Sequence, residues 1–172
     1  RCTSKSDQAD MRIGIEAQRV FRRNKHGMDY VVLQEIKELQ QIDTQNEYFV
    51  FVAPGIDRCL KDTKNVHIIV IGESFYPVWE QITLPRAVKK YNLDILHCTS
   101  NTAPIFCDVP LILTLHDIIF LEPRDKNNKS IYQNLGWLYR RKVVPKILQK
   151  CRRIITVRSR SEERRVGKEC RS

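Results

Sequence analysis

The sequence predicts an α/β protein built on a Rossmann-like, doubly wound and mostly parallel sheet. Strand-like and helix-like segments alternate along the chain, which is typical of repeated βα units. In addition, residues 111–115 (LILTL) form an uncharged, apolar run. A strand that is apolar on both faces is typical of a parallel sheet covered by helices, because a sheet with one wet face would alternate polar and apolar residues. We therefore place residues 110–120 in the middle of the sheet.

Each predicted strand is a short apolar or β-branched run bounded by glycine, proline or polar residues. The six strands cover residues 12–17, 47–53, 66–71, 94–97, 111–115 and 153–157. In the first strand, Gly14 is expected to leave room for a close neighbour.

Helices are predicted where apolar side chains recur with a period of 3.6 residues, at 28–42, 76–91 and 131–150. The second helix opens at Pro77 and is expected to be interrupted at Pro85. The apolar residues at helical spacing define the faces that we expect to pack. They are Trp79, Ile82 and Val88 in the second helix, and Leu135, Leu138, Val143, Ile147 and Leu148 in the third.

A chain of 172 residues, 42% of them hydrophobic, suits one domain with an ordinary core, which we place at residues 11–159. Residues 1–10 contain no apolar run before Met11 and are expected to be a non-native or untranslated leader. Residues 160–172 (RSEERRVGKECRS) resemble the translation of a sequencing adapter and are expected to be an artefactual tail. The alternative for this tail is a solvated helix.

The formal net charge of +10 indicates a polyanionic neighbour, such as nucleic acid, an anionic membrane or a phosphate-bearing ligand. The cysteines within residues 11–159 show neither C-x-x-C nor zinc-site spacing. Free thiols in a reducing cytoplasm are therefore expected. No apolar run of about 18 residues is present, so no transmembrane helix is predicted.

Polar side chains follow two strands that should lie side by side. His116 and Asp117 come directly after the apolar run, and residues 97–101 (HCTSN) end the preceding strand. Ligands of open α/β sheets bind beyond these carboxyl ends, where an imidazole can transfer a proton or donate a hydrogen bond. Alternatively, His116 and Asp117 only cap the end of a strand. A zinc site is disfavoured because this edge offers no third histidine.

A basic loop at residues 18–27 joins the first strand to the first helix and ends in Gly27. A glycine there lets the backbone approach a bound group closely, and the helix amino terminus offers unpaired N–H groups to a phosphate. The alternative is a plain turn with a solvated basic flank.

Five motifs resemble the amino-terminal half of a bacterial family-4 glycosyltransferase. They are M-R-I-G-I-E-A-Q-R-V-F with K-H-G-M-D, W-E-Q-x-x-L-P, I-L-H-C-T-S-N-T-A-P, P-L-I-L-T-L-H-D and R-I-I-T-V. The resemblance implies one half of a GT-B fold, in which two Rossmann-like domains face each other and the amino-terminal one binds the acceptor. It further implies glycan biosynthesis with retention of configuration, a nucleotide-sugar donor as substrate, and no metal or other cofactor.

The resemblance also implies roles for individual residues. His116 would lie against the transferred sugar as the catalytic residue, and the backbone of Gly27 would approach the donor diphosphate. Arg19 would face a phosphate-bearing acceptor or the membrane. The remaining substrate contacts would come from His97, Thr99, Asn101 and Asp117.

The donor-binding half of the family is not found after Ser159, so we expect a fragment that is inactive by itself. The expected partners are a nucleotide-sugar, a glycan or lipid-linked acceptor and the missing donor domain, with peripheral membrane contact and no nucleic acid. One alternative is a subunit of a two-chain glycosyltransferase. Another is a stand-alone basic module for nucleic acid or another polyanion, which is disfavoured because the cations are scattered without interleaved aromatic residues.

Overall fold

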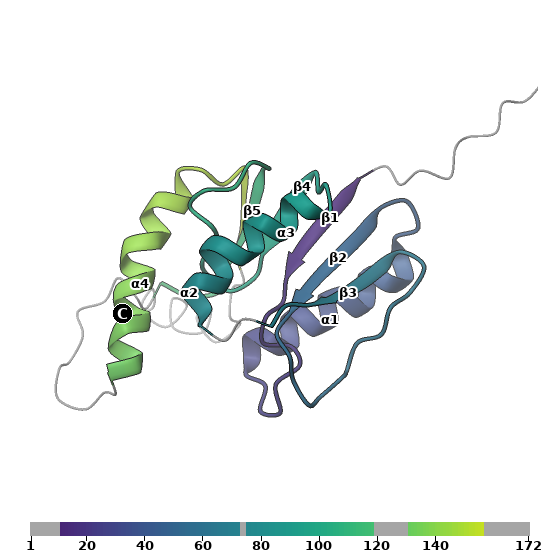
Figure 1. Ribbon diagram of the computed structural model, residues 1–172, viewed down its shortest axis with the longest axis horizontal. Helices are drawn as coiled ribbons and strands as arrows, with labels where there is room; N and C mark the ends of the chain where they lie inside the picture. Colours follow the sequence, from purple (N-terminus) through teal and green to yellow (C-terminus); the bar gives the residue numbers. More distant parts are fainter. Residues whose placement is uncertain (1–10, 73–74, 119–130, 157–172) are drawn as a thin grey trace, which may run out of the picture.

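The computed structural model describes residues 11–72, 75–118 and 131–156. Six parallel strands form one sheet in the order β3-β2-β1-β4-β5-β6 (Figure 1). The strands are β1 (Arg12–Glu16), β2 (Glu47–Val52), β3 (Val66–Val70), β4 (Ile95–Cys98), β5 (Leu111–Leu115) and β6 (Arg153–Thr156). The predicted Rossmann-like parallel sheet is thus confirmed. The expected leader, the expected tail and the proposed end near Ser159 lie outside the described residues.

Helices cover both faces of the sheet. Helix α1 (Gly27–Ile42) packs on one face through Val32, Leu33 and Ile36. The opposite face carries α2 (Tyr76–Val78), the π-helix η1 (Trp79–Thr83), α3 (Leu84–Lys90) and α4 (Ile131–Leu148). Each face has its own buried apolar cluster, as expected for a doubly wound sheet.

Strand β5 is not in the middle of the sheet, as its apolar sequence had suggested. It is flanked by β4 and β6, and β6 forms the edge. The central strands are β1 and β4. The chain crosses back through α4 and adds β6 beyond β5, so β5 has a neighbour on each side without being central.

The helix that contains Pro85 is not interrupted, contrary to the prediction. It continues through η1, where the N–H of Leu84 donates to the carbonyl of Trp79, five residues earlier. A proline lacks the donor that an α-helical turn needs and clashes with the carbonyl four residues before it. The wider π turn accommodates Pro85. Trp79 and Val88 are buried as expected, whereas Ile82 is 44% exposed.

Helix α4 buries a narrower stripe than predicted. Val143 and Ile147 are buried, but Leu135 and Leu138 are 49% and 43% exposed. The first turns of α4 extend past the edge of the sheet, so no strand lies beneath these two leucines (Figure 1).

Gly14 makes the close approach that the sequence predicted. A Cβ atom at this position would lie 2.6 Å from Leu93 Cδ1, 3.0 Å from Leu96 Cδ1 and 3.2 Å from a ring carbon of Phe51. These atoms belong to the apolar cluster beneath α3, so even one methyl group would overpack it.

We therefore expect Gly14→Ala to lower the free energy of unfolding by about 1–3 kcal/mol in urea denaturation. Gly136→Ala is the matched control, because a Cβ there meets nothing within 4 Å. An alanine inside a helix should raise the free energy of unfolding by roughly 1 kcal/mol. Equal effects of the two substitutions would contradict the packing described for Gly14.

Candidate functional site

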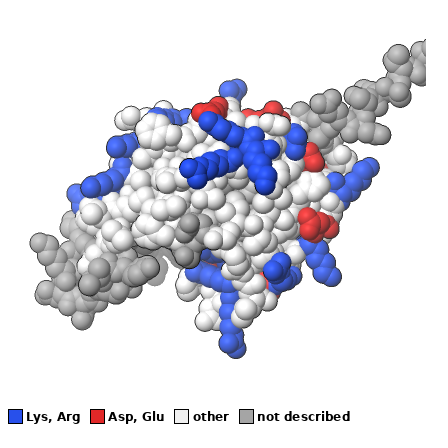
Figure 2. Space-filling model, viewed as in Figure 1, with Lys and Arg blue, Asp and Glu red and all other residues white. Residues whose placement is uncertain are grey.

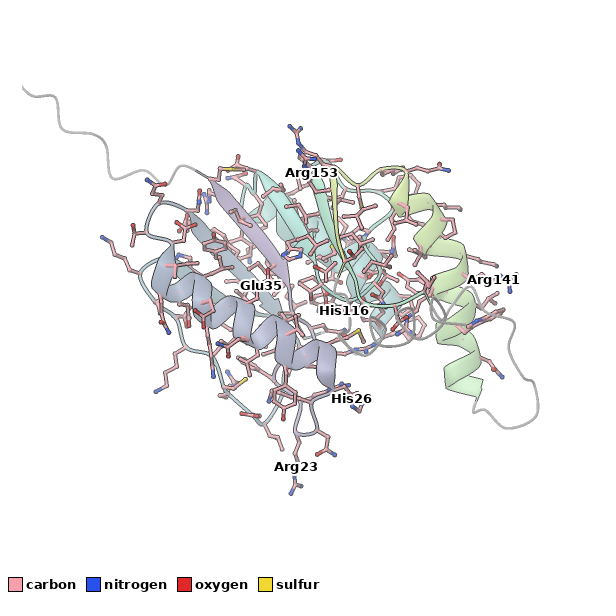
Figure 3. The ribbon with its side chains drawn as sticks, turned by 180° about the vertical axis from the view of Figure 1, so that it is seen from behind. Arg23, His26, Glu35, His116, Arg141 and Arg153 are labelled. Atoms are coloured by element: carbon pink, nitrogen blue, oxygen red, sulfur yellow. The ribbon has the colours of Figure 1, made fainter. Side chains whose placement is uncertain are left out.

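The candidate site lies at the edge of the sheet where all six strands end. Because the strands are parallel, this edge collects the residues that follow β1, β4 and β5 and the amino terminus of α1. Figure 3 shows His116 and His26 at this edge, and Arg153, at the start of β6, at the opposite one. The edge is the place where ligands bind in open α/β sheets.

The position and tautomer of His116 are set by two hydrogen bonds. Its backbone N–H donates to Asn101 Oδ1 at 2.6 Å, and its ring Nε2 lies 2.8 Å from the carbonyl oxygen of Thr99. A carbonyl can only accept, so Nε2 carries the hydrogen of this bond. In the neutral imidazole Nδ1 is then the acceptor. The residue is partly exposed, and among the described residues no hydrogen bond to Nδ1 is formed.

Asn101 holds the loop after β4 against the end of β5. Its φ of 63° is left-handed, a conformation that asparagine tolerates better than most residues. Its own N–H donates to the carbonyl of Thr114 at 3.3 Å. The side chain is buried, and its amide oxygen accepts from the backbone of His116.

Thr99 joins the ends of β1 and β4. Its hydroxyl lies 2.6 Å from the backbone oxygen of Glu16, to which it donates, and 3.2 Å from Glu16 Oε2. The buried Glu16 carboxylate also accepts from the backbone N–H groups of Thr99, at 3.3 Å, and Gln18, at 3.2 Å. Thr99 is therefore a structural link between two strands and shapes the edge from inside.

His97 lies away from the open edge, between the sheet and α1. Its Nε2 is 2.8 Å from Thr114 Oγ1 and its Nδ1 is 3.0 Å from Glu35 Oε1, and the residue is 6% exposed. Both ring nitrogens are occupied by protein partners. His97 thus connects β4, β5 and α1 and has no ring nitrogen left for a ligand.

A fully buried carboxylate, Glu80, connects several elements behind the edge. Its oxygens accept from the hydroxyl of Tyr76 at 2.7 Å and from Gln81 Nε2 at 2.9 Å. They also accept from the hydroxyls of Thr102 and Tyr139. These donors come from α2, η1, the loop after β4, and α4. Burial raises the pKa of Glu80 above its ordinary value, although the hydrogen bonds oppose this shift.

Two of the hydroxyls around Glu80 also contact each other. Tyr76 Oη lies 2.9 Å from Thr102 Oγ1, and both oxygens contact Glu80 Oε1. Glu16 contributes further negative charge nearby, which raises the pKa of Glu80 in the same direction.

The basic loop before α1 is only partly available to a ligand. Arg22 pairs with the buried Asp29, and Lys25 pairs with Asp57. Arg19, by contrast, places its guanidinium 5.4 Å from the centroid of the Tyr76 ring and is partly exposed. Within the described residues, no carboxylate forms a salt bridge with Arg19. Arg19 is therefore a cation of this loop that can bind an anion.

Gly27 is the first residue of α1 and is exposed. A Cβ at this position would meet nothing within 4 Å, so the space beside the α-carbon of Gly27 is open. The first backbone N–H groups of a helix have no partner within the helix. The carboxylate of Asp29 already accepts the N–H of His26 at 2.7 Å, and Arg22 balances its charge.

Asp117 follows His116 at the same edge and is exposed. In the described part of the chain, no three histidine, cysteine or acidic side chains are grouped closely enough to hold a metal ion. Sequence reasoning missed the roles of Glu16 and Glu80. The sequence offered one signal for each residue. Glu16 ends an apolar strand, and Glu80 follows a tryptophan that was expected to pack inward.

A comparison with protein families shows what the chain is similar to. The model of Glycosyltransferase Family 4 matches residues 26–170, a range that runs from the start of α1 past β6. The chain belongs to glycosyltransferase family 4. A comparison with curated proteins finds no match. The family and the parallel sheet together confirm the resemblance seen in the motifs, and they support a role of glycosyltransferase type.

The family acts generally on nucleotide-sugars and acceptors. The strand order in the sheet of this chain agrees with one half of a GT-B fold. None of the described helices has the length and apolar character needed to cross a bilayer.

Substitutions of Asn101 test how the His116 backbone is held. Asn101→Gly keeps the freedom for a left-handed φ but leaves the His116 N–H without its acceptor, which should cost about 1–3 kcal/mol of unfolding free energy. Asn101→Ala adds backbone strain and should cost about 1–2 kcal/mol more. Urea denaturation measures both costs, and the amide resonance of His116 should shift in both variants. An unshifted resonance would rule out the hydrogen bond.

The raised pKa of Glu80 predicts how stability depends on pH. The unfolded chain releases this proton near the ordinary glutamate pKa of about 4.3, while the folded protein retains it to higher pH. The free energy of unfolding should therefore fall as pH rises from about 4 towards the folded-state pKa. Glu80→Gln should lack this contribution. Denaturation of both proteins between about pH 4 and 7 isolates the difference, since their other titrating groups are the same. Parallel curves would show that Glu80 ionises normally.

Proposed function

We propose that this chain is the acceptor-binding half of a retaining glycosyltransferase that uses a nucleotide-sugar and needs no metal. The observation that carries the proposal is the orientation of His116 at the carboxyl edge. With Nε2 donating to Thr99, the ring keeps Nδ1 as an acceptor on a partly exposed residue. Membership of family 4 supplies the reaction class.

His116 would act on the group being transferred. Its Nδ1 can accept a hydrogen bond from a hydroxyl of the acceptor or of the sugar, and the ring can stabilise positive charge that develops on the sugar. Both effects require a ring that is already in place before the substrate binds. The hydrogen bonds to Asn101 and Thr99 supply this rigidity.

Gly27 and Arg19 would serve the phosphate groups of the two substrates. The donor diphosphate would approach the first N–H groups of α1, and the open space beside the α-carbon of Gly27 supports this approach. Arg19 is held over the face of Tyr76, whose hydroxyl is in turn held by Glu80. A guanidinium fixed in this way binds a phosphate with well-oriented donors, which suits a phosphate-bearing acceptor.

The other residues named from the sequence take supporting roles in this proposal. Asn101 and Thr99 hold His116, and His97 anchors β4 to α1. Asp117 is left as a substrate contact because it is exposed at the same edge.

Sugar transfer requires a donor-binding half in addition to this domain. We propose that it belongs to the same polypeptide and that residues 11–159 alone do not catalyse transfer. The alternative is a separate subunit that supplies the donor half. An open reading frame that continues past the codon of Ser159 into a second Rossmann-like pattern would favour the first arrangement.

His116→Ala tests the proposed function in the enzyme that includes its donor half. Turnover should fall on the order of a hundredfold, because one preorganised polar group at the reacting centre is lost. His67→Ala is the matched control. His67 lies near the start of β3, where Nε2 is 2.8 Å from Glu47 Oε1, far from the carboxyl edge. Its substitution should leave turnover unchanged. Unchanged turnover in His116→Ala would reduce His116 to a cap on the end of β5.

A further inference from the structure

Helix α1 packs on only one half of the sheet. The buried apolar cluster beneath it takes its strand residues from β1, β2 and β3, with Ile15, Val50 and Val66 among them. Within the described residues, β4 and β5 contribute no side chain to this cluster, and their buried apolar residues belong to the cluster on the opposite face. Apolar contact is also non-directional. It therefore holds α1 on β1–β3 but does not fix the helix relative to the strands that lead to His116.

One polar contact crosses from α1 to the other half of the sheet. His97 of β4 places its Nδ1 3.0 Å from Oε1 of Glu35 in α1. Of the salt bridges among the described residues, only this one joins a helix to a strand. Figure 3 shows Glu35 on the side of α1 towards His116. Because a carboxylate can only accept, Nδ1 carries the hydrogen of this bond.

The contact is shielded from water more than a surface ion pair is. On the face that carries α3, charged side chains stand out from the surface (Figure 2). Lys89 and Asp108, for example, form a pair although their side chains are 69% and 68% exposed, and water screens such a pair. The side chains of His97 and Glu35 are only 8% and 32% exposed. A charge-assisted hydrogen bond in this setting is directional and can hold two elements at a fixed position.

The second ring nitrogen of His97 extends the link towards His116. Its Nε2 lies 2.8 Å from Thr114 Oγ1, and both residues are buried. Thr114 is two residues before His116, and its carbonyl accepts the N–H of Asn101 at 3.3 Å. The side chain of Asn101 in turn accepts the backbone N–H of His116. A continuous path of hydrogen bonds and backbone thus runs from the middle of α1 to His116.

We propose that Glu35 and His97 are a positioning pair that fixes the amino terminus of α1 relative to His116. This inference rests on the proposed function, in which the donor diphosphate lies at Gly27 and the transferred sugar at His116. These two groups belong to different halves of the sheet, because Gly27 begins α1 and His116 follows β5. A misplacement of about 1 Å can cost about a hundredfold in rate. The pair keeps diphosphate and imidazole aligned without contacting a substrate itself.

Glu35→Gln tests the pair in the enzyme that includes its donor half. The amide keeps the size of the side chain but weakens the bond to His97, because it carries no charge. Turnover should fall on the order of tenfold, whereas KM for the nucleotide-sugar should change by less than about twofold, since the diphosphate still binds at α1. Glu38→Gln is the matched control. Glu38 is exposed on the same helix, where it accepts from Gln34 at 2.6 Å, and its substitution should leave both constants unchanged.

Two combined variants show whether the effect passes through His97 and His116. His97→Leu removes both ring contacts, so adding Glu35→Gln to it should cost no further turnover, because both changes break the same link. Glu35→Gln should likewise cause little further loss in His116→Ala, since the group that the pair aligns is then absent. Circular dichroism checks that each variant is folded. Glu35 is partly exposed, so Glu35→Gln remains informative even where the buried His97→Leu does not fold.

A measurement on the chain of 172 residues tests the link without turnover. Residual dipolar couplings of the backbone N–H groups report the orientation of α1 relative to β4 and β5. We expect this orientation to change in Glu35→Gln and to match that of the wild type in Glu38→Gln. A pair that served only general stability would lower the free energy of unfolding and leave the couplings of the folded protein unchanged.

Three results would overturn the proposal: unchanged couplings in Glu35→Gln, equal kinetic effects of Glu35→Gln and Glu38→Gln, or a raised KM for the nucleotide-sugar with unchanged turnover. The last result would assign Glu35 to donor binding. Unchanged turnover in His116→Ala would instead contradict the proposed function, whereas the couplings would still report whether Glu35 holds α1 against β4. Failure of the positioning pair and failure of the sugar-transfer proposal are therefore distinguishable.

Discussion

The parallel pairing of β1 with β4 is the contact on which the site depends. From β1 the chain builds outward to β2 and β3, and then returns across the sheet to β4 on the other side of β1. In such sheets the connections that leave these two neighbouring strands run in opposite directions. A crevice therefore forms beyond the carboxyl ends of the two strands. Gly14 allows the side chains under β1 to pack closely, and Glu16 with Thr99 joins the two strands where they end. The arrangement of His116 follows from this junction, because its ring bonds to the carbonyl of Thr99.

Two buried carboxylates organise the polar edge in different ways. Glu16 accepts mainly from backbone groups and so fixes main-chain positions, whereas Glu80 accepts from side chains of several elements. A buried acid is costly unless its hydrogen bonds are satisfied, and a satisfied network makes a local structure rigid. The network also restricts the position of Arg19, because its guanidinium lies over the ring of Tyr76 and the hydroxyl of Tyr76 donates to Glu80.

Local sequence pattern was sufficient to predict the strands, the helices and the parallel sheet. The same pattern could not predict the position of each strand in the sheet. Apolar residues on both faces of β5 are equally compatible with a central strand and with a strand next to the edge. Among the site residues, His116 and Gly27 were placed at the expected edge, since that placement follows from strand direction alone. The partners of His97 could not be predicted in the same way. The residue lies within β4, and its contacts depend on Glu35 of α1 and Thr114 of β5, which are distant in sequence. The network of Glu80 likewise combines residues that only the tertiary fold brings together.

The π turn in η1 changes which residues one continuous helix can bury. In a regular α-helix, residues five apart point about 140° away from each other, so Trp79 and Leu84 could not both face the sheet. The i→i+5 register brings such residues onto the same side, and both are fully buried. One additional residue in a single turn thus widens the inward arc of the helix enough to hold a tryptophan, a leucine and the carboxylate between them. The carboxylate of Glu80 thus points into the interior because the π turn changes the direction of the side chains, and the helix needs no loop or break at this position.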